Sequence, residues 1–189
     1  MSQVKQKKCR VCKALFAPVR PMQAVCSPAC AIAKVKADNT KKAKASLAAK
    51  RKETALRKES IKTKPVLIRE AQAEFNKFIR ARDKGKPCIS CGKPDSGVAN
   101  QRDAGHYRSV GSCPELRFDE DNTFGQCISC NRYLSGNAVD YRLGLIVRIG
   151  LERVERLEGK HPPKNYTHDQ LRAIKATYRA KLKEIERGN

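Results

Sequence analysis

Hydrophobic residues recur every three or four positions in four stretches of this chain, and the pattern predicts amphipathic helices. The first begins at Pro65, two more span residues 139–149 and 151–157, and the last opens at Thr167. Gln170 stands three residues after Thr167, which matches a capping box at the start of that last helix. The apolar stripe of the first helix, expected to pack on a core, consists of Leu67, Ala71, Phe75, Phe78 and Ile79.

Shorter patterns in the middle of the chain predict a small β region. Residues 103–108 have the character of one strand, and residues 116–118 alternate apolar and basic side chains as a second strand would. Residues 119–122 are expected to form a turn. A short helix should then carry Asn131 and end near residues 135–137. The whole chain is therefore predicted to be α+β, with a small β core and helices on both sides of it in the sequence.

Residues 34–64 form a segment of a different kind, rich in Ala and Lys, with twelve basic and three acidic residues. The segment contains neither Gly nor Pro, and its residues are strong helix formers, so a continuous helix is expected. It has few large apolar side chains to bury. We expect a solvated rod or a fraying linker whose charge is available to phosphate groups. A solubilising spacer that contacts nothing is the alternative.

Charge is the strongest bulk property of the 189 residues: 41 Lys and Arg against 19 Asp and Glu give a formal net charge of +22. Such a surplus repels itself in a compact monomer and fits beside a polyanion, with DNA or RNA ahead of an anionic membrane. No segment reaches the ~18 consecutive apolar residues of a membrane span, and the N-terminus does not resemble a signal peptide. We expect a cytoplasmic protein that acts on nucleic acid and not at a membrane.

The nine cysteines are therefore expected in a reducing compartment, where paired spacings indicate metal ligands better than disulfides. Two Cys-x-x-Cys pairs in the middle of the chain have the spacing of a four-thiolate zinc site. The 35 residues between these pairs are more than most compact zinc ribbons contain. The inserted segment is therefore expected to present a functional side chain, and His106 is the candidate. The four predicted ligands are Cys88, Cys91, Cys127 and Cys130.

A second set of four cysteines predicts a small N-terminal zinc knuckle, made of Cys9, Cys12, Cys26 and Cys30. Ser27 and Pro28 suit the N-cap and first position of a helix, which would place Cys30 in its first turn. The knuckle either orders too few residues to do more than hold the chain together, or contacts DNA directly. Cys113 is left over and is expected to be a half-buried thiol.

A zinc ion bound by four thiolates has no free position for a reactive water, so any hydrolytic chemistry here would need a second ion. Phosphodiester hydrolysis requires a base, a cation beside the phosphate, and positioning. His106 suits the base, because its ordinary pKa lies near neutrality. Asp103 and Asn131 offer hard oxygen ligands for Mg²⁺ or Mn²⁺, and Asn122 is expected to hydrogen-bond around His106 and fix its ring.

These residues resemble the zinc-stapled HNH, or ββα-metal, nucleases, which include recombination endonuclease VII, and more closely the NinG/Rap family of lambdoid phages. The resemblance covers essentially the whole chain. It is carried by residues 87–92, 103–108, 116–118, 127–131, 135–137 and 141–142. It implies a zinc-stapled ββα-metal core of the HNH or treble-clef type, and a structure-specific endonuclease that cuts D-loops and Holliday junctions in phage recombination.

The same resemblance implies that His106 is the general base, Asn131 the metal ligand after the second knuckle, and Asn122 the middle Asn of the motif. One departure matters. Many HNH sites carry a metal-binding Asp or His directly before the base, where this chain has Gly105. Asp103 is the expected replacement, although side chains three residues apart in an ideal strand point to opposite faces. Asn137 and Asp119 are the reserve candidates.

The predicted domains are residues 1–33 (zinc knuckle), 34–64 (basic helical linker), 65–138 (nuclease core) and 139–189 (C-terminal helices). The cofactors are two structural zinc ions and a catalytic Mg²⁺ or Mn²⁺. Branched DNA is the expected partner, with phage or host recombination proteins as further candidates and a homodimer to supply two active sites for symmetric cleavage. A non-catalytic zinc protein that binds nucleic acid or assists recombination is the alternative. The expected DNA-contacting residues are Arg108, Arg132, Lys41, Lys42, Lys50, Arg51 and Lys52.

Overall fold

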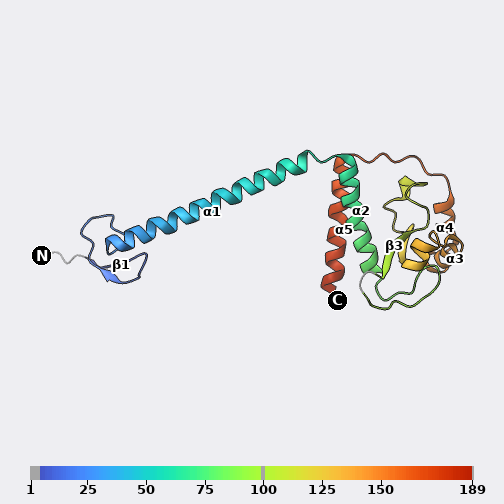
Figure 1. The fold of residues 1–189 in the computed structure, drawn as a ribbon, viewed down its shortest axis with the longest axis horizontal. Helices are drawn as coiled ribbons and strands as arrows, with labels where there is room; N and C mark the ends of the chain where they lie inside the picture. Colours follow the sequence, from blue (N-terminus) through green and yellow to red (C-terminus); the bar gives the residue numbers. More distant parts are fainter. Residues whose placement is uncertain (1–4, 99–100, 189) are drawn as a thin grey trace. The chain divides into compact units, whose positions relative to one another are not determined.

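The computed structural model describes residues 5–98 and 101–188 and divides the chain into two compact units, Met1–Ile61 and Lys62–Asn189 (Figure 1). Helices and two small two-stranded antiparallel sheets make up these units, which confirms the α+β class. In the described part of the chain, no helix is both long and apolar enough to span a membrane.

The N-terminal unit consists of a short hairpin followed by one long helix. Strand β1 (Lys7–Lys8) pairs with β2 (Leu15–Phe16), and helix α1 spans Pro28–Ser60. The side chain of Ser27 accepts a hydrogen bond from the amide of Cys30 (3.3 Å), which confirms the predicted cap. All 33 residues of α1 are described, and none of them is buried. The basic segment is therefore a solvated helix as far as Ser60, whereas residues 61–63 are not helical and end the predicted run before residue 64.

Two long helices form one side of the second unit. Helix α2 (Lys64–Arg82) packs along α5 (His168–Gly188), and the two lie side by side in Figure 1. The ring of Phe75 meets that of Tyr178 edge-on, with 4.7 Å between centroids. The predicted apolar stripe of α2 is confirmed, because its buried residues are Leu67, Ala71, Phe75, Phe78 and Ile79.

The central sheet pairs β3 (Arg102–His106) with β4 (Thr123–Cys127) in antiparallel register. Only the first of the two predicted strands is confirmed: residues 116–118 do not form a strand. The chain there makes a single 3₁₀ turn, η1 (Pro114–Leu116), followed by further turns. Pro114 favours the first position of such a turn and lacks a backbone N–H for a strand ladder, and three alternating residues were too short a pattern to outweigh it.

The end of α2 is fastened to β4 by a buried carboxylate. Asp83 is 6 % exposed, and its Oδ2 accepts hydrogen bonds from the amide of Gly125 (2.9 Å) and from the guanidinium of Arg82 (2.7 Å). Arg82 also donates to the carbonyl of Thr123 (2.8 Å). These bonds fix one edge of the sheet against the helix, so the position of α2 determines what surrounds β3.

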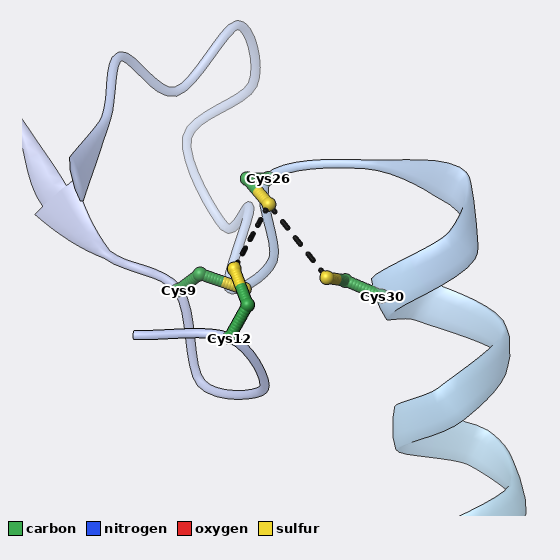
Figure 2. A group of neighbouring side chains, drawn as sticks. All are labelled: Cys9, Cys12, Cys26 and Cys30. Atoms are coloured by element: carbon green, nitrogen blue, oxygen red, sulfur yellow. Dashed lines mark hydrogen bonds between the residues drawn. The ribbon is translucent and has the colours of Figure 1, made fainter. Parts of the chain in front are cut away.

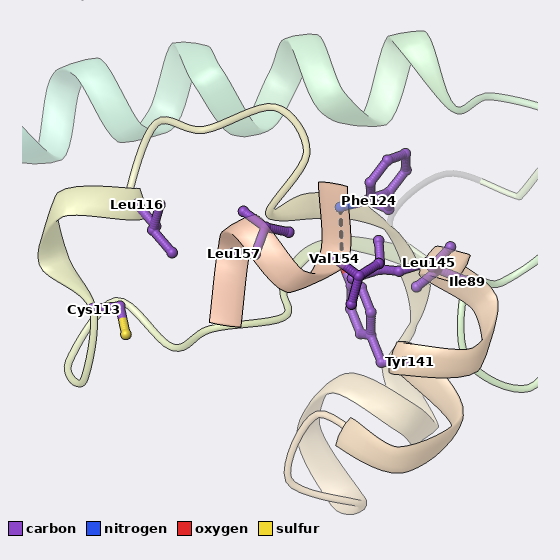
Figure 3. Packing of buried hydrophobic residues seen from close by; sticks show 8 residues of the cluster. All are labelled: Ile89, Cys113, Leu116, Phe124, Tyr141, Leu145, Val154 and Leu157. Carbon is purple, nitrogen blue, oxygen red and sulfur yellow. Dashed lines mark hydrogen bonds between the residues drawn. The ribbon is translucent and has the colours of Figure 1, made fainter. Parts of the chain in front are cut away.

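The first two α-helices that follow β4 in the chain cover the opposite side of the sheet. Helices α3 (Ala138–Ile149) and α4 (Leu151–Glu158) are confirmed close to their predicted bounds, and so is the capping box that opens α5. The Tyr141 hydroxyl donates to the carbonyl of Gly105 (2.7 Å) and accepts from the amide of Phe124 (2.9 Å), the bond drawn in Figure 3. This buried bridge ties both strands to α3 at the centre of the apolar cluster.

Candidate zinc centres and catalytic site

The four N-terminal cysteines converge, with all their sulfur atoms within 4.8 Å of one another (Figure 2). Two of the separations are 3.5 Å (Cys12 to Cys26) and 3.7 Å (Cys26 to Cys30). A tetrahedral zinc ion with Zn–S bonds of ~2.3 Å requires sulfur separations of roughly 3.8 Å, so the set fits zinc. Burial raises the pKa of Cys9, but backbone hydrogen bonds at Cys12 and other knuckle residues outweigh it and lower that pKa to about 6. The thiolate form that a metal requires is therefore favoured at Cys9, whereas side-chain hydrogen bonds with Cys12 and Cys30 raise the pKa of Cys26 to about 12.

The central tetrad has the same geometry and is more deeply buried. Its four sulfur atoms also lie within 4.8 Å of one another, with 3.8 Å between Cys91 and Cys127. The amide of Cys127 donates to the Cys88 sulfur (3.3 Å). Burial opposes ionisation of Cys88, yet backbone amides lower its pKa to about 7. Zinc held here would connect the turn after α2 to the end of β4 and to Cys130 of the next helix.

Cys113 belongs to neither tetrad. It is 7 % exposed and packs in the apolar cluster of Figure 3. Its sulfur accepts a hydrogen bond from Nε of Arg108 (3.4 Å). The leftover thiol is thus a core residue and lies deeper than the half-buried position expected for it.

The second knuckle leads directly into a single π-helical turn, η2 (Ser129–Tyr133), which carries Asn131. Nδ2 of Asn131 donates to Oδ2 of Asp103 (2.9 Å). Arg132 donates to both oxygens of the same carboxylate, from Nε to Oδ2 (2.7 Å) and from Nη2 to Oδ1 (2.9 Å). The Arg132 guanidinium keeps the pKa of Asp103 below its usual range, so the carboxylate is ionised. The structure therefore brings the two expected metal ligands together and places a basic side chain on one of them, Asp103.

His106 has a different set of neighbours. Its Nε2 lies 3.1 Å from the carbonyl of Arg117, and its ring centroid is 6.2 Å from that of Phe75 in α2. Burial lowers the pKa of His106. Hydrogen bonds to the backbone of Arg117 and Ala104 raise this pKa, but by less, so the net shift is downward. Ala104 of the same strand packs against the α2–α5 core. His106 therefore shares the α2-facing side of β3, whereas Asp103 occupies the side that meets η2.

Asn122 is fully buried and makes three hydrogen bonds. Its Oδ1 accepts from the amide of Arg108 (2.8 Å), and its Nδ2 donates to the carbonyls of Arg108 (3.0 Å) and Leu116 (3.2 Å). Its side chain contacts the backbone of Arg108 and Leu116 and not the imidazole itself, so the expected bond to the His106 ring is not formed. Since Arg117 follows Leu116, Asn122 holds in place the loop whose carbonyl meets His106.

Two contacts at the site were not anticipated from the sequence. Gln126 is fully buried and pairs with Asp103 across the sheet, with its Nε2 donating to Ser90 Oγ (2.8 Å) and the Gly136 carbonyl (2.6 Å). A Cβ atom at Gly105 would lie 2.2 Å from Gln126 Oε1. The one available signal was Gly105 itself, because glycine within a strand often marks a close approach of other atoms.

The remaining expected residues are the two reserve ligands and five basic residues of the N-terminal unit. The reserve ligands are engaged elsewhere, Asp119 with Arg156 and Asn137 with Asp140. The five basic residues singled out in the long helix are all exposed on α1: Lys41, Lys42, Lys50, Arg51 and Lys52.

The chain is similar to known sequences over nearly its whole length. The family model described as Bacteriophage Lambda NinG protein matches residues 1–188. This chain belongs to the NinG family. It is 40 % identical to Protein ninG of Escherichia phage 933W, over 98 % of this chain and 96 % of that relative. Protein ninG of Salmonella phage P22 and that of Escherichia phage lambda are each 46 % identical over 69 % of the chain, covering 63 % and 62 % of those relatives. No solved structure matches.

Proposed function

We propose that this NinG family member is a metal-dependent endonuclease of the HNH type that cuts branched DNA in phage recombination, with D-loops and Holliday junctions as substrates. The observation that carries the proposal is the convergence of Asp103 and Asn131 on one face of β3, with His106 at the end of the same strand. A half-buried imidazole with a lowered pKa is neutral at physiological pH, the form a general base requires.

The opposite faces of Asp103 and His106 are compatible with this function. In many of the nucleases that the chain resembles, the metal ligand directly precedes the base, and neighbouring residues of a regular strand also project from opposite faces. Asp103 shares a face with position 105, two residues further on. A ligand at position 105 would collide with Gln126, so Asp103 is the nearest residue on that face able to supply a carboxylate.

In the proposed reaction, Nε2–H of His106 donates to the Arg117 carbonyl, which leaves Nδ1 to take a proton from the attacking water. Asp103 and the Asn131 amide oxygen would hold the divalent cation, which stabilises charge on the phosphate and the departing 3′ oxygen. Arg132 must first leave the carboxylate. Its side chain is 59 % exposed, and a DNA phosphate is a competing anion for it, so substrate binding would free Asp103.

The test compares nicking of a labelled four-way junction by the wild type, His106→Ala and His168→Ala, where His168 is an exposed histidine of α5. Divalent metal should be omitted and not chelated, because a strong chelator also competes for zinc. We expect metal-dependent nicking, lost by about 10²-fold or more in His106→Ala with junction affinity retained, and unchanged in His168→Ala. Full activity of folded His106→Ala would refute the assignment of the base.

A non-catalytic function has one specific observation in its favour. Both oxygens of Asp103 are occupied by Arg132, and Asn131 presents its amide nitrogen and not its oxygen to that carboxylate. If the wild type shifts junctions without nicking them in Mg²⁺ or Mn²⁺, the chain is a zinc-containing DNA-binding or recombination accessory protein.

A further inference from the structure

The loop between the two cysteine pairs of the N-terminal knuckle presents apolar side chains to solvent. Met22 is 93 % exposed and Val19 is 89 % exposed, and Met22 is the most exposed large hydrophobic side chain in the described part of the chain. The α+β fold does not require either residue to be hydrophobic, since neither contributes to a core. Exposed apolar side chains of this kind indicate an interaction surface when a second feature defines the partner.

The loop is held in a defined shape by hydrogen bonds. The Gln23 side chain accepts from the Val19 amide (2.8 Å) and donates to the Val25 carbonyl (3.0 Å). The Gln23 amide donates to the Arg20 carbonyl (3.1 Å), and Lys7 Nζ donates to the Pro21 carbonyl (3.2 Å). Val19 and Met22 are therefore displayed on a braced turn, which reduces the entropy lost when they meet a partner.

The surroundings of this turn are uniformly basic. Residues 5–30 contain six basic residues and no acidic residue. The complementary partner is a polyanion with accessible apolar faces. Nucleic acid fits this description where base pairs are unstacked, because proteins insert Met, Leu or Pro side chains at such steps beside basic contacts. An anionic membrane is less suitable, because stable membrane anchoring takes a larger apolar surface than two side chains provide.

We propose that Val19 and Met22 pack against the exposed faces of base pairs at a DNA branch point. A wedge that enters a continuous duplex must first unstack neighbouring base pairs, whereas a branch point already interrupts the stack. The N-terminal knuckle would then contribute preference for branched over linear DNA. This inference rests on the proposed function only in its substrate, and it requires no cleavage.

The experiment uses the full-length chain and compares Val19→Ala/Met22→Ala with Val147→Ala, an apolar residue of α3 that is 89 % exposed. Zinc content and circular dichroism establish folding. We expect the ratio of four-way-junction to linear-duplex affinity to fall by roughly tenfold in the double variant and to stay constant in Val147→Ala. 2-Aminopurine placed at the branch should change in fluorescence on binding of the wild type and not of the double variant.

An unchanged affinity ratio in the folded double variant would overturn the inference, and so would an equal loss of affinity for duplex and junction. Tighter binding of the wild type than of the double variant to vesicles of anionic lipid, without a 2-aminopurine response, would assign the loop to a membrane surface instead. Absence of nicking bears only on the proposed endonuclease, because both readouts here measure binding.

Discussion

Burial of the His106 ring has a consequence for stability that does not depend on catalysis. Burial lowers the pKa of the folded-state ring below 6.5. At pH values between this lowered pKa and 6.5, the unfolded chain therefore binds more protons than the folded chain. The stability that the neutral ring contributes is complete above pH 6.5 and is lost as the pH falls through the folded pKa. We expect an NMR titration of the ring to show a midpoint below 6.5. A midpoint at or above 6.5 would mean that the ring is solvated.

Gly105 and Gln126 form a second contact whose importance can be measured at single residues. A methyl group at position 105 would meet Gln126 Oε1 at 2.2 Å, and the Gln126 amide cannot move freely because Ser90 and Gly136 hold its nitrogen. We expect Gly105→Ala to lower the free energy of unfolding by about 1–3 kcal/mol, as overpacking does in other cores.

The double variant Gly105→Ala/Gln126→Ala supplies the control. Removing the Gln126 side chain frees the space, so the cost of Gly105→Ala should be much smaller in that background. Urea denaturation of the wild type, the two single variants and the double variant measures the coupling free energy between the two positions. Strictly additive effects would show that the two residues do not meet and that the β3–β4 register is wrong.

Among the elements, the two zinc knuckles should be separable. Each tetrad lies within one compact unit, so loss of one site leaves the ligands of the other intact. We expect two zinc ions per wild-type chain and one in Cys127→Ser, with the helices of the second unit destabilised because the tetrad joins three of its segments. Cys26→Ser should also retain one zinc, with the second unit still folded.

Cys113→Ser is the matched control for these variants, because Cys113 is a buried cysteine outside both tetrads. Metal analysis should give two zinc ions for this variant. A single zinc ion in Cys113→Ser, or two in Cys127→Ser, would contradict the four-thiolate assignment.

The helices were predictable from the sequence because a local period determines them. The spacing from Leu67 to Ile79 and the Thr167–Gln170 capping box each depend on nearby residues only. Strand β4 was missed for the opposite reason. All five of its residues are buried, so it has no alternation of polar and apolar positions, and η2 and the helices cover it from both sides.

The site was predictable in its residue types but not in its contacts. Cysteine spacing gave both tetrads, because ligand chemistry fixes that spacing. The bond between His106 and the Arg117 carbonyl, and the Arg132 pair on Asp103, are set by how distant segments pack. No local pattern in the sequence encodes them. The placement of Asp103 and His106 on opposite faces of β3, by contrast, follows from their three-residue offset in one strand.

Across the whole molecule, charge is concentrated where burial is absent. Residues 1–61 hold sixteen basic and three acidic residues, a formal charge of +13 out of +22. Helix α1 has no buried residue, so its basic side chains are free to meet phosphate groups without disturbing a core. We therefore expect α1 to dominate the salt dependence of DNA binding.

The variant to measure replaces five exposed basic residues with Gln, which preserves helix propensity: Lys41, Lys42, Lys50, Arg51 and Lys52. Each phosphate contact contributes ~0.9 to the slope of log affinity against log salt, so five contacts would set an upper limit of about 4.5 on the decrease in slope. The five side chains point in different directions around α1, so the measured decrease should lie below that limit. The control removes five exposed charges of the second unit: Lys77, Lys160, Arg179, Lys183 and Arg187. If net charge alone governed binding, the slope of log affinity against log salt would decrease by the same amount in both variants. If α1 lies along the DNA backbone, the slope decreases only in the first variant, and any nicking at saturating protein continues because His106 is untouched.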